Sequence, residues 1–357
     1  MPSSKFHHKP FDEGTLTKLN LFELYTREWL PVFLASPTPQ RTVIHLFDFF
    51  AGPGTDSKGT PGSPIRLLKQ VAQYRGQPGW KNVRIFVHLF DKSKSKINRL
   101  KENINQLTPR MEEITVECEP WKFVKAFQTS TPLLEDESAA KLVFIDQFGV
   151  DEVTDEVFRK LVAAPACDFL FFLTSSTLHQ FRDHPAIKQK IVRPDDYYHV
   201  HRKVLEYYQE LLPDPASYYL APFSIKKGSN IYGVIFSSRH PLGMDKFLEV
   251  AWKQDEVNGE ADYDIGRENM VPAQPTLFPD IKPGKVANFE RDLEQRLRAG
   301  YLHHEIDVMK VCFEHGVLRR HAAPVLKKLK QERIIDIDFR VPGVDRLRDP
   351  RPIRMLR

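Results

Sequence analysis

The chain has 357 residues, of which 41% are hydrophobic and 28% are charged. This composition argues against a disordered chain and suffices for one large core with a small appended module. The formal net charge of +5 comes from 52 basic and 47 acidic side chains, a balance that permits a polyanionic partner without requiring one.

Membrane and secretion signals are missing from the sequence. No apolar run approaches the roughly 20 residues of a membrane span, and the opening MPSSKFHHKPFDEG contains no apolar signal region. The three cysteines, Cys118, Cys167 and Cys312, are odd in number and too widely spaced for a disulfide framework or a zinc knuckle. We therefore expect a cytoplasmic protein with no membrane contact, no metal site and free, buried thiols.

The first elements are those that open a nucleotide-binding α/β fold. Apolar residues recur at helical spacing over 15–34, which predicts an amphipathic helix. Residues 43–50 are β-branched and aromatic, typical of a buried strand, and lead into a Gly-Pro-Gly turn at 52–54. Ser63 as N-cap and Pro64 in the first turn are the expected start of the next helix.

Strands and helices then alternate along the chain. Strands are expected at 83–90, 114–118, 142–146 and 169–174, and helices at 93–107, 121–129 and 154–163. This alternation predicts a doubly wound, mostly parallel sheet with helices on both faces, as in Rossmann-like folds. Ligands of such sheets bind at the carboxyl ends of the strands.

The remaining segments predict an antiparallel edge, a linker and a terminal module. After a helix at 193–212, strands at 218–225 and 231–237 are separated by a turn, and a further helix is expected at 245–252. A stretch rich in Pro, Gly and polar residues follows, and then come three predicted helices with an extended segment, typical of a winged-helix-like module. We divide the chain into an α/β domain at 1–257, a linker or mobile loop at 258–284 and the winged-helix-like module at 285–357.

Three aspartates, Asp48, Asp91 and Asp146, end predicted parallel strands. Gly52 and Gly54 would let the backbone approach a ligand closely, although a glycine turn by itself fits an ordinary tight turn equally well. Asp91 follows the glycines by roughly 40 residues, where doubly wound folds place an acid that binds ribose hydroxyls. Together these residues predict a nucleoside site. For Asp146, capping of the following helix is the alternative.

Residues after the third strand would lie beside the base of a bound nucleoside. Glu119 could accept a hydrogen bond from an exocyclic amino group, and Cys118 or Trp121 could line the ring. Core packing explains Trp121 equally well.

Other polar residues offer weaker candidates. His179, Arg182 and His184 follow the strand at 169–174, but surface or capping roles are commoner for such side chains. Helical packing is the simplest explanation of the aromatic and histidine series, since His199 and His201 lie on different helix faces; the series comprises Tyr197, Tyr198, His199, His201, Tyr207 and Tyr208.

The predicted helix at 319–331 carries basic residues that would suit contacts with nucleic-acid phosphates, namely Arg319, Arg320, Lys327 and Lys328. Charge runs are also common on solvated faces, and winged-helix modules also dock proteins. Nucleic-acid binding is therefore one of two interpretations of the tail, and protein docking is the other.

Several motifs, in their order and spacing, resemble the three-Cys-motif partner protein family (TcmP), which is similar to class I S-adenosylmethionine-dependent methyltransferases. They are DFFAGPG at 48–54, GSPIRLL at 62–68, FIDQFG at 144–149, IYGVIFSS at 231–238 followed by HPLGMDKFLEVAWKQD, and the tail. The resemblance covers most of the chain. The family name refers to cysteines of a separate partner, not to the three cysteines here.

The resemblance implies a cofactor and a partner. The cofactor would be S-adenosylmethionine, and the residues implied to form its site are Asp48, Phe50, Gly52, Gly54, Asp91 and Glu119, with Asp146 beside them. The implied partner is a three-Cys-motif protein of the iron–sulfur or radical type.

One departure from the wider methyltransferase pattern concerns the fourth strand. Enzymes that methylate amino groups of adenine or cytosine usually carry Asp-Pro-Pro-Tyr there, whereas this chain has Asp146-Gln147-Phe148-Gly149. The acid and an aromatic are kept, so Asp146 would polarise the nucleophile and Phe148 would stack on the acceptor. The resemblance thus implies a methyltransferase acting on DNA or RNA. Loss of both prolines favours the alternative, a catalytically silent subunit that binds the cofactor or nucleic acid and supports the partner enzyme.

Overall fold

The computed structural model describes residues 9–107, 113–146, 153–173, 200–214, 218–227, 230–256, 259 and 284–356, without the side chains of 173, 200–203 and 226–232. The chain forms two compact units, Met1–His240 and Pro241–Arg357. Among the described residues, no helix is long and apolar enough to cross a membrane.

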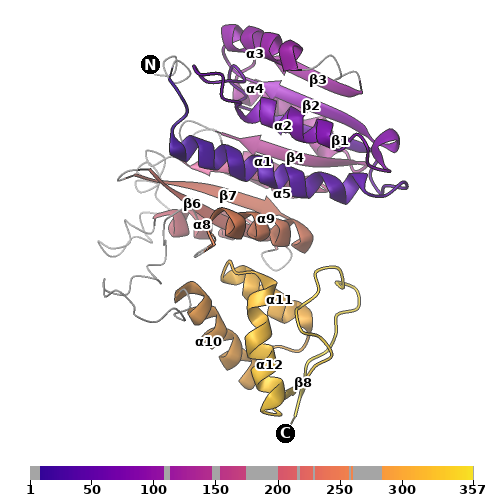
Figure 1. Cartoon of the computed structure of the whole chain (residues 1–357), viewed down its shortest axis with the longest axis vertical. Coiled ribbons are helices and arrows are strands. Elements are labelled where there is room, and N and C mark those ends of the chain that lie inside the picture. Colours follow the sequence, from indigo (N-terminus) through magenta and orange to yellow (C-terminus); the bar gives the residue numbers. More distant parts are fainter. Residues whose placement is uncertain are drawn as a thin grey trace. The chain divides into compact units, whose positions relative to one another are not determined.

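The first unit is built on a seven-stranded sheet (Figure 1). Its strands are β1 Val43–Asp48, β2 Arg84–Phe90, β3 Ile114–Glu119, β4 Ala139–Ile145, β5 Cys167–Leu173, β6 Tyr219–Lys227 and β7 Asn230–Ser238. They lie in the order β3-β2-β1-β4-β5-β7-β6. β1 to β5 are parallel, whereas β7 runs antiparallel to both β5 and β6. The predicted doubly wound, mostly parallel sheet with a late antiparallel pair is confirmed.

Helices cover both faces of this sheet. They are α1 Glu13–Leu34, α2 Ser63–Gln73, α3 Lys94–Leu107, α4 Phe123–Glu135, α5 Asp155–Ala163 and α8 Val200–Glu210, and a short 3-10 turn, η2, spans Trp80–Asn82. In Figure 1, α1 and α2 lie on the near face, where Phe22 of α1 stacks on Phe144 of β4 with 4.1 Å between ring centroids. Because side chains alternate along a strand, Phe47 of β1 faces the other way and joins the aromatic core beneath α4, α5 and α8.

Two tyrosines of the polar-aromatic series belong to that second core. Tyr208 is buried, and its hydroxyl donates to the carbonyl of Val153 at 3.0 Å, while the Tyr207 hydroxyl donates to Asp155. The packing explanation is confirmed for these two residues. Tyr197, Tyr198 and His199 lie outside the described residues.

Strand β4 begins at Ala139, three residues before the predicted start, and therefore includes Lys141. The Lys141 side chain is fully buried, and its ammonium donates to the carbonyls of Asp136 and Pro165. A buried lysine satisfied by main-chain oxygens does not interrupt a strand, although its charge suggests a boundary.

The second unit consists of helices and a small antiparallel pair of strands. Its elements are α9 Pro241–Gln254, α10 Gly284–Arg298, α11 Glu305–Glu314, η5 Arg319–Ala322, α12 Ala323–Gln331, β8 Ile335–Asp336 and β9 Arg354–Met355. The single helix predicted at 319–331 is thus a 3-10 turn followed by an α-helix with Pro324 in its first turn.

Helix α9 groups with the tail rather than with the sheet. The Trp252 indole donates to the carbonyl of Gly316 at 3.0 Å, and Arg319 forms two hydrogen bonds with Asp245. With α9 in the second unit, the boundary between the two units lies after residue 240, earlier than the boundary at 257 expected from the sequence. Of the predicted linker at 258–284, residues 258 and 260–283 lie outside the described residues.

Candidate functional site

The three strand-end aspartates lie at one edge of the sheet. Asp48 is the last residue of β1 and pairs in register with Leu89 of β2 and Phe144 of β4. Asp91 and Asp146 come directly after β2 and β4. Because these three strands are parallel neighbours, the structure brings the acids together as the sequence predicted.

The glycine turn after β1 is fixed by its neighbours. The Ala51 amide donates to the carbonyl of Phe90 at 2.8 Å, and the Asn103 amide of α3 donates to the carbonyl of Pro53 at 2.7 Å. Gly52 and Gly54 have φ values of 62° and 87°, a backbone region that L side chains rarely adopt. A Cβ on Gly54 would also lie 2.8 Å from Leu100 Cδ1. Within the described chain, neither glycine amide donates to an acceptor.

Asp56 organises the loop between this turn and α2, a role that sequence reasoning missed. One carboxyl oxygen accepts from the amides of Lys58 and Thr60, each at 2.8 Å, and the other accepts from the amide of Phe11 at 2.8 Å. Burial raises the pKa of Asp56, but these hydrogen bonds outweigh it and hold the pKa below its usual value. The sequence signal was the turn-like Asp-Ser-Lys-Gly.

Asp48 is buried with one carboxyl oxygen unsatisfied. Oδ1 accepts from the amide of Phe50 at 3.0 Å, whereas Oδ2 has no hydrogen-bond partner among the described residues. Burial raises the pKa of Asp48 to about 7; the hydroxyl of Ser63, the Phe50 amide and the charge of Lys18 oppose this rise, and the charge of Asp146 adds to it. Ser63 was predicted as the N-cap of α2, but Gly62 takes that position and Ser63 is the first residue of the helix.

Lys18 of α1 is the functional candidate that sequence reasoning overlooked. Its ammonium donates to Asp146 Oδ2 at 2.5 Å and lies 4.4 Å from the centroid of the Phe172 ring. Lys18 is only 7% exposed. The available signal was its position on the apolar stripe of the helix, with Phe22 and Tyr25 one and two turns further on.

Asp146 has one oxygen engaged and one available. Its side chain is 18% exposed, and Oδ1 has no hydrogen-bond partner in the described part of the chain. The helix that follows, α5, is capped by Thr154, whose side chain accepts from the amide of Val157. The alternative in which Asp146 caps that helix is therefore wrong.

Asp91 and Glu119 adjoin at the ends of β2 and β3. The Asp91 amide donates to the carbonyl of Glu119 at 3.4 Å. Asp91 Oδ1 accepts from the amide of Ser93 at 2.8 Å, and Oδ2 lies 3.5 Å from Lys96 Nζ, so the carboxylate also fixes the turn into α3. Carboxylate oxygens accept more than one hydrogen bond, so both retain capacity for a ligand hydroxyl.

The aromatic and thiol candidates near these acids are packed. Trp121 stacks on Phe90 with 5.8 Å between ring centroids, and Phe50 stacks on Phe123 at 5.7 Å. Burial raises the pKa of Cys118 to about 11, which keeps its thiol protonated at neutral pH. Cys118 and Glu119 line a cavity of about 540 Å³ between α3 and β3.

The remaining predicted residues divide into three groups. Phe148, Gln147, His179, Arg182 and His184 lie outside the described residues. Arg319 is engaged with Asp245, and Lys328 donates to both oxygens of Glu294 at 2.8 Å. Arg320 and Lys327 are exposed and form no hydrogen bond or ion pair with another described residue.

The comparisons with known proteins bear on the fold. No family model matches the chain, and no curated protein matches it. Among solved structures, Trm1 from Pyrococcus horikoshii in complex with S-adenosyl-L-methionine is similar at 12% identity and a TM-score of 0.40, over 80% of this chain and 73% of that one.

Two further structures match at the same level. An O-methyltransferase from Bacillus cereus in complex with SAH is 11% identical, with a TM-score of 0.34 over 65% of this chain and 82% of that one. Spermidine synthase from Thermotoga maritima is 12% identical, with a TM-score of 0.34 over 64% and 60%. Because these likenesses are distant, the fold is assigned from the strand order. A seven-stranded sheet with parallel β1 to β5 and an antiparallel β7 gives the chain a doubly wound, Rossmann-like fold.

Proposed function

We propose that this chain is a class I S-adenosylmethionine-dependent methyltransferase-like protein of the TcmP kind, with its site where β1, β2 and β4 end. The observation that carries the proposal is Asp48 Oδ2, a buried carboxyl oxygen without a partner. Such an oxygen costs free energy unless a ligand supplies a donor. A cationic nucleoside ligand suits this group, because an ammonium supplies both hydrogen-bond donors and the opposite charge.

The surrounding residues fit the rest of that ligand. The φ values of Gly52 and Gly54 leave the turn without a Cβ, and their amides are available as donors. Asp91 and Glu119 offer carboxylates at the neighbouring strand ends, where ribose hydroxyls and an adenine amino group need acceptors. When bound, S-adenosylmethionine supplies an electrophilic methyl group on its sulfonium.

Asp146 would act on the methyl acceptor. Its Oδ1 can accept a hydrogen bond from an amino or hydroxyl group and so orient the nucleophile, while Lys18 holds Oδ2 in place. Stacking by Phe148 remains a prediction.

A catalytically silent subunit is the second candidate, and the same ion pair favours it. Lys18 engages one of the two carboxylate oxygens of Asp146, so only the other oxygen could contact a methyl acceptor. In that case the chain would bind cofactor or nucleic acid and support a three-Cys-motif partner of the iron–sulfur or radical type.

Isothermal titration calorimetry with S-adenosylmethionine tests the cofactor proposal. We expect the wild type to bind, and Asp48→Ala and Gly54→Trp to lose binding. Glu137→Ala serves as the control, because Glu137 is exposed and precedes the start of β4, at the opposite end of that strand from the site. No heat with the wild type would refute the cofactor site. Transfer of a labelled methyl group to DNA, RNA or protein then separates the two candidates; no transfer to any of them, with the partner present, would support the silent subunit.

The tail would contribute a winged-helix-like nucleic-acid contact. Three helices precede the β8–β9 pair, and the loop between these strands is anchored at Glu305, which accepts from the Gly343 amide at 2.7 Å and binds the Arg351 guanidinium. Arg320 and Lys327 remain available to phosphates, whereas the structure engages Arg319 and Lys328 elsewhere.

Salt titration of duplex DNA binding tests the tail. Replacing Arg320 and Lys327 by glutamine should reduce the slope of log affinity against log salt by about 1.8, because each lost phosphate contact accounts for about 0.9. The matched variant is Lys310→Gln with Arg340→Gln, at other positions of the same unit. A slope that is equal in wild type and the Arg320/Lys327 variant would remove this role of the tail.

A further inference from the structure

The segment that follows β2 is unusually basic. Residues 91–101 hold five cations, Lys92, Lys94, Lys96, Arg99 and Lys101, against one acid, Asp91. Asp91 is already engaged by Lys96 at 3.5 Å. The side chains of Lys92 and Lys94 are exposed and form no hydrogen bond or ion pair with another described residue. The excess positive charge is therefore not used within the described fold.

Helix stability does not explain these lysines. Lys94 and Lys96 lie in the first turn of α3, which contains no acid. Cations at the first turn of a helix face the positive end of the helix dipole and destabilise it. Residues that break a local rule of this kind are candidates for function.

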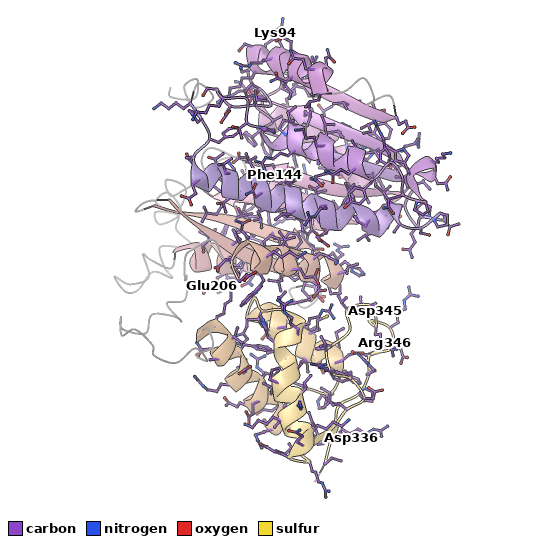
Figure 2. The ribbon with its side chains drawn as sticks, viewed as in Figure 1. Lys94, Phe144, Glu206, Asp336, Asp345 and Arg346 are labelled. Carbon is purple, nitrogen blue, oxygen red and sulfur yellow. The ribbon has the colours of Figure 1, made fainter. Side chains whose placement is uncertain are left out.

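Two more lysines come to the same edge from the neighbouring strand. Lys122 and Lys125 follow β3, which is the parallel neighbour of β2, with Phe90 and Glu119 paired in register. The Lys125 ammonium lies 4.3 Å from the centroid of the Trp121 ring, which itself stacks on Phe90. Lys122 is exposed, and its ammonium has no hydrogen-bond or ion-pair partner in the described residues. Figure 2 shows Lys94 on α3 at the margin of this unit.

We infer that Lys92, Lys94, Lys122 and Lys125, here called the basic edge, bind the phosphate backbone of a single-stranded nucleic acid. This rests on the proposed function, because the basic edge borders Asp91 and Glu119 and would deliver a strand to that site. Phosphates are the anions that a row of flexible ammonium groups recognises without base specificity. A single strand suits a base-modifying site, since a base inside a duplex is out of reach.

Fluorescence anisotropy with 20-nucleotide RNA and DNA single strands, over a range of salt concentrations, tests the inference on the full chain. The triple variant Lys92→Gln, Lys94→Gln, Lys122→Gln should reduce the slope of log affinity against log salt by about 2, since each phosphate contact on a single strand accounts for about 0.7. At about 0.1 M salt this corresponds to roughly 100-fold weaker binding.

The matched control removes three exposed cations elsewhere in the same unit: Lys69→Gln, Lys81→Gln, Arg84→Gln. Arg84 begins β2 and so lies at the opposite end of that strand. This control has the same net charge as the test variant and should retain the wild-type slope. Equal losses in the two triple variants would overturn the inference, as would an unchanged slope in the test variant, or binding to anionic lipid vesicles without binding to either oligonucleotide.

Cofactor calorimetry on the same variants keeps this inference separate from the proposed function. The basic-edge variant should bind S-adenosylmethionine as the wild type does, because none of its three lysines belongs to the cofactor site. If the wild type binds oligonucleotides through these lysines but gives no heat with the cofactor, the proposed function is wrong, whereas the inference about the basic edge is supported. If the cofactor binds but the salt dependence of oligonucleotide binding is the same in wild type and basic-edge variant, only the inference about the basic edge is wrong.

Discussion

Replacing Lys18 by methionine should lower the free energy of unfolding by about 3–5 kcal/mol, which is the usual cost of leaving one partner of a buried ion pair uncompensated. The Lys18 and Asp146 side chains are only 8% and 18% exposed, so water does little to replace the lost ammonium. Urea denaturation at pH 7.5 measures the change. Lys81→Met, at an exposed position on η2, is the control and should change stability by less than about 0.5 kcal/mol.

A double-mutant cycle distinguishes the ion pair from simple loss of packing. Asp146→Asn removes the other charge, and the double variant Lys18→Met/Asp146→Asn should be more stable than the sum of the two single losses predicts, by roughly 0.5–3 kcal/mol. Additive losses would mean that Lys18 contributes only its aliphatic stem. If the chain is an active methyltransferase, Lys18→Met should also lower methyl transfer more than cofactor affinity, because Lys18 contacts Asp146 rather than Asp48.

Asp48→Asn should make the protein more stable at pH 8 while weakening cofactor binding. The pKa of Asp48 is raised from 3.8 to about 7 in the folded state, because burial disfavours the charged form. The unfolded chain therefore releases this proton near pH 4, whereas the folded chain keeps it until about pH 7. The contribution of Asp48 to stability is therefore greatest below pH 4 and falls as the pH rises to 7, by on the order of 4 kcal/mol.

Urea denaturation of wild type and Asp48→Asn at pH 5 and pH 8 measures this effect. Asparagine cannot ionise, so the variant should lack the part of the decline in stability that Asp48 causes. Burial also raises the pKa of Asp168 to about 6, but Asp168 is present in both proteins, so its contribution cancels when their stabilities are compared. Wild type should also bind S-adenosylmethionine about tenfold more tightly at pH 8 than at pH 6, because the ionised carboxylate is the form that attracts a cation. Parallel stability profiles for the two proteins would show that Asp48 ionises at its ordinary pKa.

Local sequence patterns predicted those features that depend on a single helix, strand or turn. They did not predict features that depend on contacts between elements distant in the sequence. The period of the apolar residues predicted α1 and β1, and the glycine turn predicted where β1 ends. Ser63 shows the limit of such signals: serine before a proline is a good N-cap, but in the folded chain Gly62 is the cap and Ser63 is the first residue of the helix.

The boundary between the two units shows the same limit. Composition placed it at the Pro- and Gly-rich stretch after residue 257, because linkers are commonly polar. The structure places α9 with the tail, through Arg319 and Asp245, residues 74 positions apart. No local sequence pattern predicts such a pairing. Because Arg319 is engaged by Asp245, its guanidinium is also less available for the predicted phosphate contacts.

The sequence by itself determined the parallel sheet and the meeting of Asp48, Asp91 and Asp146 at one edge, because alternating strands and helices leave parallel strands few arrangements and their carboxyl ends all face the same way. Only the tertiary structure decided the charge and partners of these acids. Lys18 pairs with Asp146 across 128 residues, and Asp48 is left buried with one oxygen unsatisfied. Burial and the distances between charged groups set protonation and pairing, and both depend on how α1 packs over β4, which the residues near each aspartate do not specify.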